Sequence, residues 1–401
     1  MTNVSLGTVD ISALAKTYVN QVLATRRLSY GPFCQEFEKQ FAALHACQAA
    51  IVCSSGTTAI HTILAALTIK YHWQRDDEVI LPVVTFVATV NAVIQAGLKP
   101  VFVDIDARTY NLDPKLVANK ISQKTKAIFP VHLFGKPAAM DQLSQLAKKH
   151  KLLLIEDCCE TIAAQYQGKK VGSFGIAAAF STNSAHVLTT GIGGVITTND
   201  LALAELMRSL INHGRDGAYI SIDDDNNLAA KSLGEVISKR FYFNHVGFSY
   251  RLSELEAALG LAQLKNLKKN ISKRLRNVHY LNQKLQVLSN LLQLPELDNK
   301  TSHVYMVYPL VLRPEIFAKL QRDLSPLLYF LEKNGIETRP FMPILGQPAY
   351  DSLKLRLKDY PVGTYCTQAG FYVGCHQDLT LKDLNYFIKY LKQFFEKVKL
   401  N

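Results

Sequence analysis

Long apolar runs and an export signal are both absent from this sequence. No apolar run approaches the roughly 20 residues that a membrane-spanning helix needs, so we expect no membrane partner. The first residues, MTNVSLGTVDISALAK, show no basic head followed by an apolar run, which argues against export. No low-complexity tract or internal repeat is evident. A chain of 401 residues, 48% of them hydrophobic, is therefore predicted to be a soluble globular protein with one large and one smaller domain.

Cysteine pairs of the kind that hold metals or build disulfide frameworks are absent as well. The seven cysteines form no CxxC pair, and two of them, Cys158 and Cys159, are adjacent. This pattern is typical of reduced thiols, so we expect a cytoplasmic protein without a metal site. Cys158 and Cys159 are interpreted as small buried apolar side chains rather than redox groups.

The net charge of +12 raises the question of a nucleic-acid partner. The lysine-rich run LKNLKKNISKRLR is the strongest candidate for such a surface. On a helix, however, these lysines fall around the solvent side of a Leu and Ile stripe, which favours a solvated face. We therefore expect no nucleic-acid partner, although the charge suits anionic small substrates.

What the sequence does contain is an alternation of β-rich runs with helical patterns. The runs AAIVCSS, DEVILPVV, PVFVDID, KAIFPVHLFG, KLLLIEDC and GIAAAFST predict an α/β core with a mostly parallel sheet between about residues 30 and 250. Ser253, with Glu256 three residues later, predicts the capped start of a long helix. We divide the chain into a large domain at 1–250 and a segment at 251–401, which comprises this helix and a small α+β domain.

Ligands of open parallel sheets bind beyond the carboxyl ends of the strands, so the residues at those ends are of most interest. Ser55, Gly56 and Thr57 begin a helix, where they either bind a phosphate or form a plain helix cap. Phe86 is either a core aromatic or a platform for a flat ring. Asp157 ends an aliphatic run and needs a positive partner, such as a protonated pyridine nitrogen. Together these three signals describe a site for pyridoxal phosphate (PLP).

The order of motifs then carries a resemblance to a known family. The segments YGPFCQEFEKQFAAL, SSGTTAI, PVVTFVATVNAVIQAGLKPVFVDID, IEDCCETIAAQYQGKKVGSFG, FSTNSAHVLTTGIGG, NHGRDG and GFSYRLSELEAALGLAQL resemble the nucleotide-sugar aminotransferase family of fold type I PLP proteins. The resemblance covers nearly the whole chain. It implies a large α/β domain with a mostly parallel sheet and a smaller α+β C-terminal domain.

The resemblance also implies roles for individual residues. Gly56 and Thr57 would hold the cofactor phosphate with help from Ser181, Phe86 would stack on the pyridine ring, and Asp157 would pair with the ring nitrogen. The family works as homodimers with shared active sites, in which the partner sends an asparagine to the phosphate. The matching position in GFSYR is Ser249, whose hydroxyl is shorter.

Two further positions depart from the aminotransferase pattern. Glu160 stands where these enzymes mostly carry glutamine, and it would hydrogen-bond the ring hydroxyl of the cofactor or cap a turn. His186 occupies the position of the Schiff-base lysine, and no lysine occurs from Val171 to Ala230. An imidazole forms no stable imine but transfers protons well, so the cofactor would be held non-covalently as pyridoxamine phosphate (PMP).

These departures resemble the lysine-free sugar 3-dehydratase branch of the family, and most of all its GDP-4-keto-6-deoxymannose type. The branch implies loss of the C3 hydroxyl from an NDP-4-keto-6-deoxyhexose, with His186 as the base and L-glutamate as the amino donor. Such sugars commonly belong to lipopolysaccharides or natural products. Because no cysteine lies between Cys159 and Cys366, we expect no iron-sulfur cluster and no reductase partner.

Two substrate candidates and two other functions remain open at this point. His213, in NHGRDG, either touches cofactor or substrate or closes a turn. Arg339, in IETRPF, either engages a carboxylate or sugar diphosphate or forms a surface salt bridge. The alternatives to dehydration are another lysine-free PLP reaction on a sugar and a catalytically silent PLP-binding relative.

Overall fold

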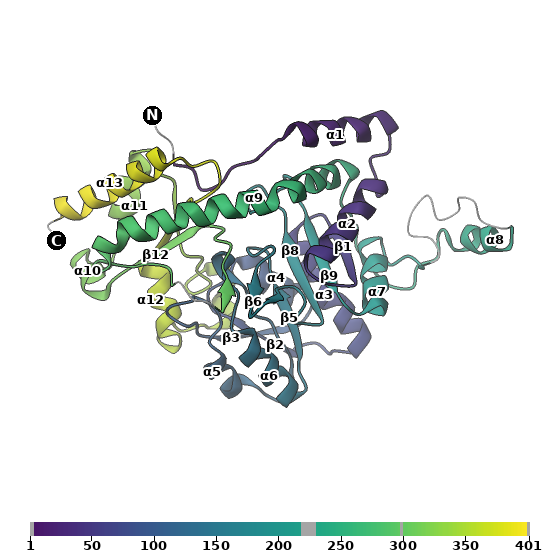
Figure 1. Ribbon diagram of the computed structural model, residues 1–401. Coiled ribbons are helices and arrows are strands. Elements are labelled where there is room, and N and C mark those ends of the chain that lie inside the picture. The colour runs from purple at the N-terminus through teal and green to yellow at the C-terminus, as the bar shows by residue number, and fades with distance from the viewer. Residues whose placement is uncertain (1–3, 218–229, 297–299, 399–401) are drawn as a thin grey trace.

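The computed structural model describes residues 4–217, 230–296 and 300–398, and a seven-stranded sheet forms the centre of its larger part (Figure 1). Across the sheet the strands are β1 (Ala49–Cys53), β9 (Gly194–Thr198), β8 (Ala177–Ser181), β5 (Leu153–Asp157), β4 (Thr125–Ile128), β2 (Glu78–Pro82) and β3 (Lys99–Val103). Strand β9 runs antiparallel to both neighbours, and all other pairs are parallel. The predicted fold class, with a mostly parallel sheet, is confirmed.

Helices follow the strands where the apolar runs give way to helical periodicity. The helices of the first two thirds of the chain are α1 (Ala13–Thr25), α2 (Pro32–Leu44), α3 (Gly56–Tyr71), α4 (Val87–Gln95), α5 (Pro114–Val117), α6 (Met140–His150), α7 (Leu201–Ile211) and α8 (Ala230–Lys239). The parallel strands are almost entirely buried, as expected for strands covered on both faces. The carboxyl ends of β2 and β5 and the start of α3 and α4 therefore meet at one edge of the sheet.

A second, four-stranded antiparallel sheet lies beyond α9 (Glu254–Leu285). Its strands in order are β10 (Leu292–Gln293), β12 (Tyr308–Leu312), β14 (Gly370–Val373) and β13 (Thr338–Pro340), and a small sheet joins β11 (Thr301–Ser302), β6 (Gln165–Tyr166) and β7 (Lys169–Lys170). The accompanying helices are α10 (Pro314–Lys319), α11 (Ser325–Lys333), α12 (Pro361–Ala369) and α13 (Leu381–Lys397). We keep residue 250 as the proposed domain boundary, since it precedes α9.

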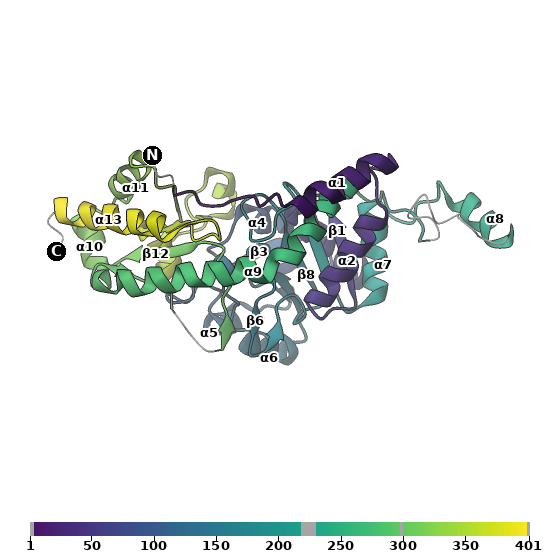
Figure 2. The ribbon, with the colours of Figure 1, turned by 45° about the horizontal axis from the view of Figure 1, so that its top comes forward.

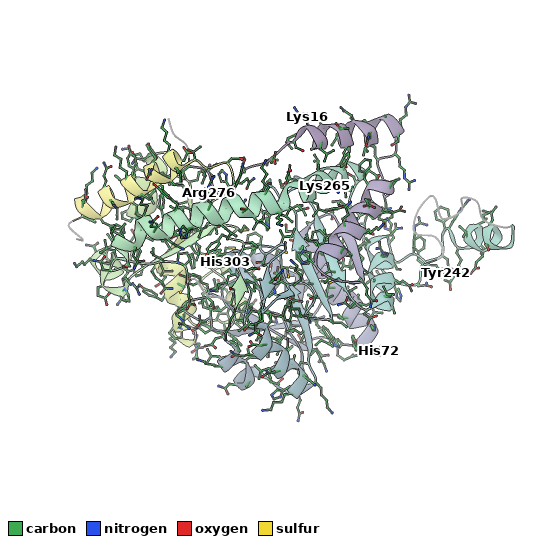
Figure 3. All side chains as sticks on the ribbon, in the orientation of Figure 1. Lys16, His72, Tyr242, Lys265, Arg276 and His303 are labelled. Atoms are coloured by element: carbon green, nitrogen blue, oxygen red, sulfur yellow. The ribbon has the colours of Figure 1, made fainter. Side chains whose placement is uncertain are left out.

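Helix α9 runs along both parts of the molecule and contacts α1, α2 and α13 (Figures 1 and 2). It begins as predicted, because the Glu256 carboxylate accepts a hydrogen bond from the Ser253 backbone N–H at 2.8 Å. Lys265 is exposed, as the solvated-face interpretation requires, and Figure 3 shows it with Arg276 along α9. Arg274 differs: it is buried and donates to the backbone carbonyls of residues 305 and 306.

The segment before α1 crosses the smaller part of the molecule and was not predicted. Val4 pairs with Ile336, and the Leu6 backbone N–H donates to the Glu337 carboxylate at 2.9 Å. A Cβ at Gly7 would lie 3.7 Å from the Cα of Ala185, so this segment lies against the loop that carries His186. The N-terminal segment therefore ties that loop to the second sheet.

Helix α8 stands apart from the rest of the molecule in both views (Figures 1 and 2). The chain that leads back from it exposes apolar side chains: Phe241 and Val246 are 82% and 95% exposed, and Tyr242 is labelled there in Figure 3. We call residues 212–217 and 230–249 the arm. None of the helices within the described ranges is long and apolar enough to cross a membrane.

Candidate functional site

The β1–α3 turn forms one wall of the candidate site. Ser55 is the N-cap of α3, and its side chain accepts a hydrogen bond from the Thr58 backbone N–H at 3.1 Å. Gly56 begins the helix with no room for a side chain, since a Cβ there would lie 2.8 Å from the Cβ of Ser181. Thr57 is exposed at the same helix start. The predicted phosphate residues are thus adjacent, beside a helix N-terminus that favours anions.

Phe86 and Asp157 lie at the ends of the strands that follow. Phe86 is the N-cap residue of α4 and is 56% exposed, which rules out the core-aromatic alternative. Asp157 ends β5, is 3% exposed, and accepts hydrogen bonds from the Thr89 hydroxyl at 2.7 Å and the Cys159 backbone N–H at 3.0 Å. Both donors are neutral, and within the described ranges no basic side chain forms an ion pair with this carboxylate.

His186 lies on the loop after β8, and its ring is held by one backbone group. The Nδ1 atom bonds to the Cys159 carbonyl oxygen, which can only accept, so Nδ1 carries the proton and Nε2 is left as the basic nitrogen. Burial lowers the pKa of His186 below its ordinary value of 6.5, while the Cys159 carbonyl and the charge of Asp157 oppose this shift. Near neutral pH the imidazole is therefore uncharged and able to accept a proton at Nε2.

Glu160 follows the same strand and is half-buried. One of its oxygens accepts a hydrogen bond from the Phe134 backbone N–H at 2.6 Å. Burial raises the pKa of Glu160 to about 8, and the neighbouring charge of Asp157 adds to the shift. At pH 7 the carboxyl group is protonated and offers an O–H donor, as the amide of a glutamine would.

His213 and Ser249 lie together at the base of the arm. The Nη2 atom of Arg251 is 3.2 Å from His213 Nε2 and 3.0 Å from the Ser249 hydroxyl, and all three side chains are exposed. The Ser54 backbone N–H donates to the Tyr250 carbonyl at 2.7 Å, which places this cluster next to the β1–α3 turn. The predicted turn role also applies to His213, whose φ of 64° lies in the left-handed region.

Arg339 is not brought into contact with the other predicted site residues. It lies on β13, and its guanidinium is 3.6 Å from a carboxylate oxygen of Glu332. Both side chains are largely exposed. The surface salt bridge that the sequence left open is therefore present, and a substrate role for Arg339 stays a prediction.

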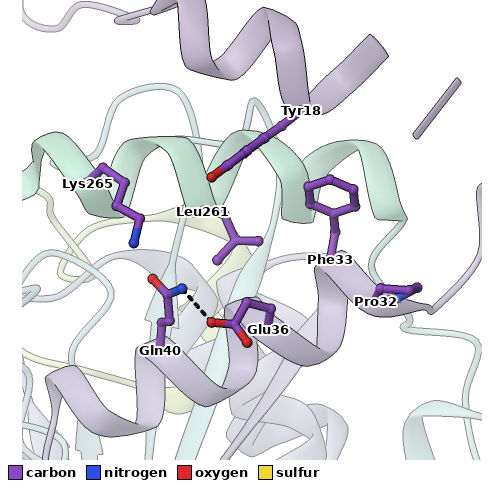
Figure 4. Close-up of a pocket in the computed structure, with 7 residues that line it drawn as sticks. All are labelled: Tyr18, Pro32, Phe33, Glu36, Gln40, Leu261 and Lys265. Carbon is purple, nitrogen blue, oxygen red and sulfur yellow. Dashed lines mark hydrogen bonds between the residues drawn. The ribbon is translucent and has the colours of Figure 1, made fainter. Parts of the chain in front are cut away.

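Two other features of the molecule lie outside this site. His132, Glu156 and Cys158 are buried and close enough to hold a metal ion. However, His132 accepts from the Ala138 backbone N–H and bonds to Glu156, which also accepts from Gly172, Phe174 and Gly175, so internal hydrogen bonds already use these groups. A groove of about 310 Å³ between α1, α2 and α9 is shown in Figure 4, and none of its lining residues is a predicted site residue.

The arrangement fits PLP on three counts. Asp157 is a buried carboxylate to which the described part of the chain brings no ion-pair partner, and a pyridinium nitrogen would supply that positive charge. Phe86 is 56% exposed at the start of α4, whose Thr89 bonds to Asp157, and the α3 N-terminus at Gly56 and Thr57 presents backbone N–H groups of the kind that bind phosphate. Cys159 lies between these groups, since it contacts Asp157, His186 and the position of Gly56.

Sequence reasoning missed three residues of this region. Thr89 bonds to Asp157, the Cys159 carbonyl orients His186, and Arg251 joins His213 to Ser249. For Thr89 a signal existed, because it is a hydroxyl residue in the first turn of the helix that Phe86 begins. The Cys159 contact spans 27 residues, and no local pattern indicates it.

Comparison with known proteins agrees with this geometry. Residues 9–392 match the model of the DegT/DnrJ/EryC1/StrS aminotransferase family. The chain is 36% identical to GDP-perosamine synthase of Caulobacter vibrioides, over 97% of this chain and 98% of that protein. It is 28% identical to GDP-4-keto-6-deoxy-D-mannose 3-dehydratase of Escherichia coli O55:H7, over 98% of this chain and 100% of that protein.

A solved structure extends the likeness to three dimensions. The E. coli GDP-4-keto-6-deoxy-D-mannose-3-dehydratase with bound hydrated PLP superimposes with a TM-score of 0.85 at 26% identity, over 98% of this chain and 100% of that one. The resemblance predicted from the motifs is thereby confirmed, and so is the PLP-dependent class of enzymes acting on nucleotide sugars. The chain belongs to the DegT/DnrJ/EryC1/StrS aminotransferase family.

Proposed function

We propose that this protein is a PMP-dependent dehydratase that removes the C3 hydroxyl from an NDP-4-keto-6-deoxyhexose. The observation that carries the proposal is the His186 imidazole, which is oriented by the Cys159 carbonyl within a site that fits PLP but offers no lysine. Similarity over the full length to a protein named as a 3-dehydratase supports the same activity.

The residues of the site have distinct tasks in this proposal. Gly56, Thr57 and Ser55 bind the cofactor phosphate through the α3 N-terminus, and Ser181 assists from the end of β8. Phe86 supports the ring, and Asp157 holds a positive charge on the ring nitrogen. When bound, PMP supplies an amine that condenses with a ketone and an electron-accepting ring.

His186 and Glu160 perform the proton chemistry and the orientation of the cofactor. Nε2 of His186 takes the proton whose loss drives the elimination of the sugar hydroxyl. Since an imidazole cannot hold the cofactor covalently, water releases the product. Glu160, protonated at pH 7, donates a hydrogen bond to the ring hydroxyl.

The net reaction balances with glutamate as the amino donor. NDP-4-keto-6-deoxyhexose and L-glutamate give the NDP-3,6-dideoxy-4-keto sugar, 2-oxoglutarate and ammonia. The two electrons that replace the C3 hydroxyl by hydrogen come from the oxidation of glutamate. Arg339 and His213 are the candidates for binding the glutamate carboxylate or the sugar diphosphate.

A second candidate reaction is transfer of an amine to the sugar. The 36% identity to a protein named GDP-perosamine synthase favours it. The test incubates purified protein with PLP, glutamate and a 4-keto-6-deoxy sugar nucleotide and analyses the product by mass spectrometry. A product that has lost one oxygen without gaining nitrogen supports dehydration, whereas a product in which an amine replaces the keto oxygen and the C3 hydroxyl is retained contradicts it. Absence of PLP uptake would contradict every catalytic role in this proposal.

The covalent state of the cofactor gives an independent test of the role of His186. His186→Lys should hold PLP through dialysis and become labelled on reduction with borohydride, while dehydration falls sharply. Wild-type protein should lose PLP on dialysis and resist labelling. Dehydration at the wild-type rate in the lysine variant would contradict the role of His186.

We further propose a cytoplasmic homodimer in which the arm of one subunit reaches the site of the other. The exposed Phe241 and Val246 are the surface that a second copy would cover, and Ser249 would then reach the phosphate of the partner's cofactor. Mixing inactive His186→Gln and Ser249→Asp proteins should restore activity, because mixed dimers contain one intact site. Persistent inactivity after mixing would mean that each site is built from one chain.

A further inference from the structure

The anchor carboxylate of Asp157 is itself held by a chain of two buried hydroxyl groups, one on α4 and one just before it. Thr89 is 1% exposed, and its hydroxyl lies 2.7 Å from Oδ2 of Asp157. The Thr85 hydroxyl lies 2.9 Å from the Thr89 hydroxyl, and the Thr89 backbone N–H donates to the Phe86 carbonyl at 3.2 Å. The ring platform Phe86 and the Thr89 hydroxyl that supports the anchor thus lie at the start of one helix, with Thr85 just before it.

The directions of these hydrogen bonds follow from the groups involved. A carboxylate only accepts, so Thr89 must donate its single hydroxyl hydrogen to Asp157. The Thr89 oxygen is then free to accept from Thr85. Oδ1 of Asp157 accepts from the Cys159 backbone N–H at 3.0 Å, so both oxygens are held while further lone pairs stay available.

We propose that Thr89 is a positioning residue for the cofactor: its hydroxyl holds Asp157 so that the free lone pairs of the carboxylate face the pyridine nitrogen. The inference rests on the anchoring role of Asp157 in the proposed function. Two donors fix the plane of the carboxylate, and hydrogen bonds to an ionised group are among the stronger ones in proteins. A carboxylate held by Cys159 alone would rotate and lose part of its interaction with the ring.

A thermodynamic cycle separates this role from a purely structural one. Dissociation constants are measured by absorbance titration, without sugar, for PLP and for the analogue in which CH replaces the ring nitrogen. Thr89→Val should raise the dissociation constant for PLP about 10- to 100-fold, the loss typical of a hydrogen bond to a charged group. For the analogue, which offers nothing for Asp157 to bind, the same variant should change the constant by about threefold or less.

Three further variants control the measurement. Thr89→Ser keeps the hydroxyl and should bind PLP like wild type. Thr198→Val removes another buried hydroxyl, that of Thr198 on β9, which donates to the Ile176 carbonyl at 2.7 Å. This variant should leave PLP binding unchanged. If Thr89→Val does not fold, Thr89→Ala compared with Thr89→Ser answers the same question, because those two differ only by the hydroxyl.

Equal losses for PLP and the analogue in Thr89→Val, or no loss for PLP, would overturn the proposal. The failure of the proposed reaction is recognised separately. Wild-type protein that binds PLP more tightly than the analogue but does not dehydrate sugar contradicts the reaction and leaves the role of Thr89 supported by its own cycle.

Discussion

Replacing His186 with glutamine should separate proton transfer from cofactor binding. The hydrogen bond that fixes the wild-type ring runs from Nδ1 to the Cys159 carbonyl, and a glutamine amide is also a donor that can reach such a carbonyl. The variant therefore keeps the loop in place but has no nitrogen that accepts a proton. We expect PLP to bind with a dissociation constant within about threefold of wild type, since one neutral hydrogen bond contributes roughly 1 kcal/mol or less.

The rate of dehydration should respond much more strongly. A positioned general base contributes about 10²- to 10⁴-fold, which corresponds to roughly 3 to 5 kcal/mol of activation free energy. Burial lowers the pKa of His186 below 6.5, so wild-type kcat/KM should rise with pH along a limb centred below 6.5 and stay level above it. In His186→Gln that limb should disappear, because no group at this position titrates.

The assay follows sugar consumption by mass spectrometry over a pH series, with PLP affinity measured by absorbance on the same samples. Stability gives a parallel readout. Because the folded-state pKa lies below the unfolded value of 6.5, the contribution of neutral His186 is complete above that pH and is lost as the pH falls below it. A variant that retains the acid limb and most of the rate would refute the assignment of the base. A rate that falls only in proportion to PLP affinity would show that His186 binds the cofactor instead.

Three further predictions test the electrostatics and packing around the site. Burial raises the pKa of Glu160 to about 8, so its contribution to stability is fully present below pH 4.5 and is lost as the pH rises towards 8. The Tm of Glu160→Gln relative to wild type, measured without PLP, should therefore rise between pH 4.5 and pH 8. A Tm difference that stays constant over this range contradicts the pKa shift. In Gly194→Ala the new Cβ would lie 2.7 Å from the backbone nitrogen of Gly56 at the start of α3. We expect the free energy of unfolding in urea to fall by about 1–3 kcal/mol and PLP binding to weaken. As a control, the Cβ of Gly234→Ala in α8 would meet no atom within 4 Å, and this variant should stabilise the protein by about 0.5–1 kcal/mol. Arg208→Ala removes the guanidinium that lies 2.7 Å from the buried carboxylate of Glu38. The free energy of unfolding should fall by about 3–5 kcal/mol, while the PLP affinity of the folded protein stays unchanged. A fall below about 1 kcal/mol would mean that water replaces the arginine.

Local patterns were sufficient for most of the fold. Each predicted β-rich run overlaps a strand of the large sheet, because nearly continuous apolar residues leave few alternatives to a strand covered on both faces. Ser253 and Glu256 predicted the start of α9, since a capping box acts between residues three apart. The antiparallel strand β9 and the N-terminal segment were not predicted, because their partners lie far away in the sequence.

Charge patterning succeeded only in part on α9. Lys265 and Arg276 are exposed, as the periodicity indicates, whereas Arg274 is buried and bonded to backbone carbonyls beside β12. A charged side chain can be buried wherever the surrounding backbone provides hydrogen-bond acceptors. The sequence around residue 274 does not indicate that such carbonyl groups lie near this side chain.

The sequence by itself determined the parallel strands and their succession along the chain, the glycine at the start of α3, the carboxylate at the end of β5 and the replacement of lysine by His186. These are properties of residue type and local spacing. Only the tertiary structure decided which nitrogen of His186 is basic, that Glu160 is protonated at neutral pH, and that Thr89 holds Asp157. Each depends on burial or on a hydrogen bond between separate elements, and such contacts exist only once the chain has folded.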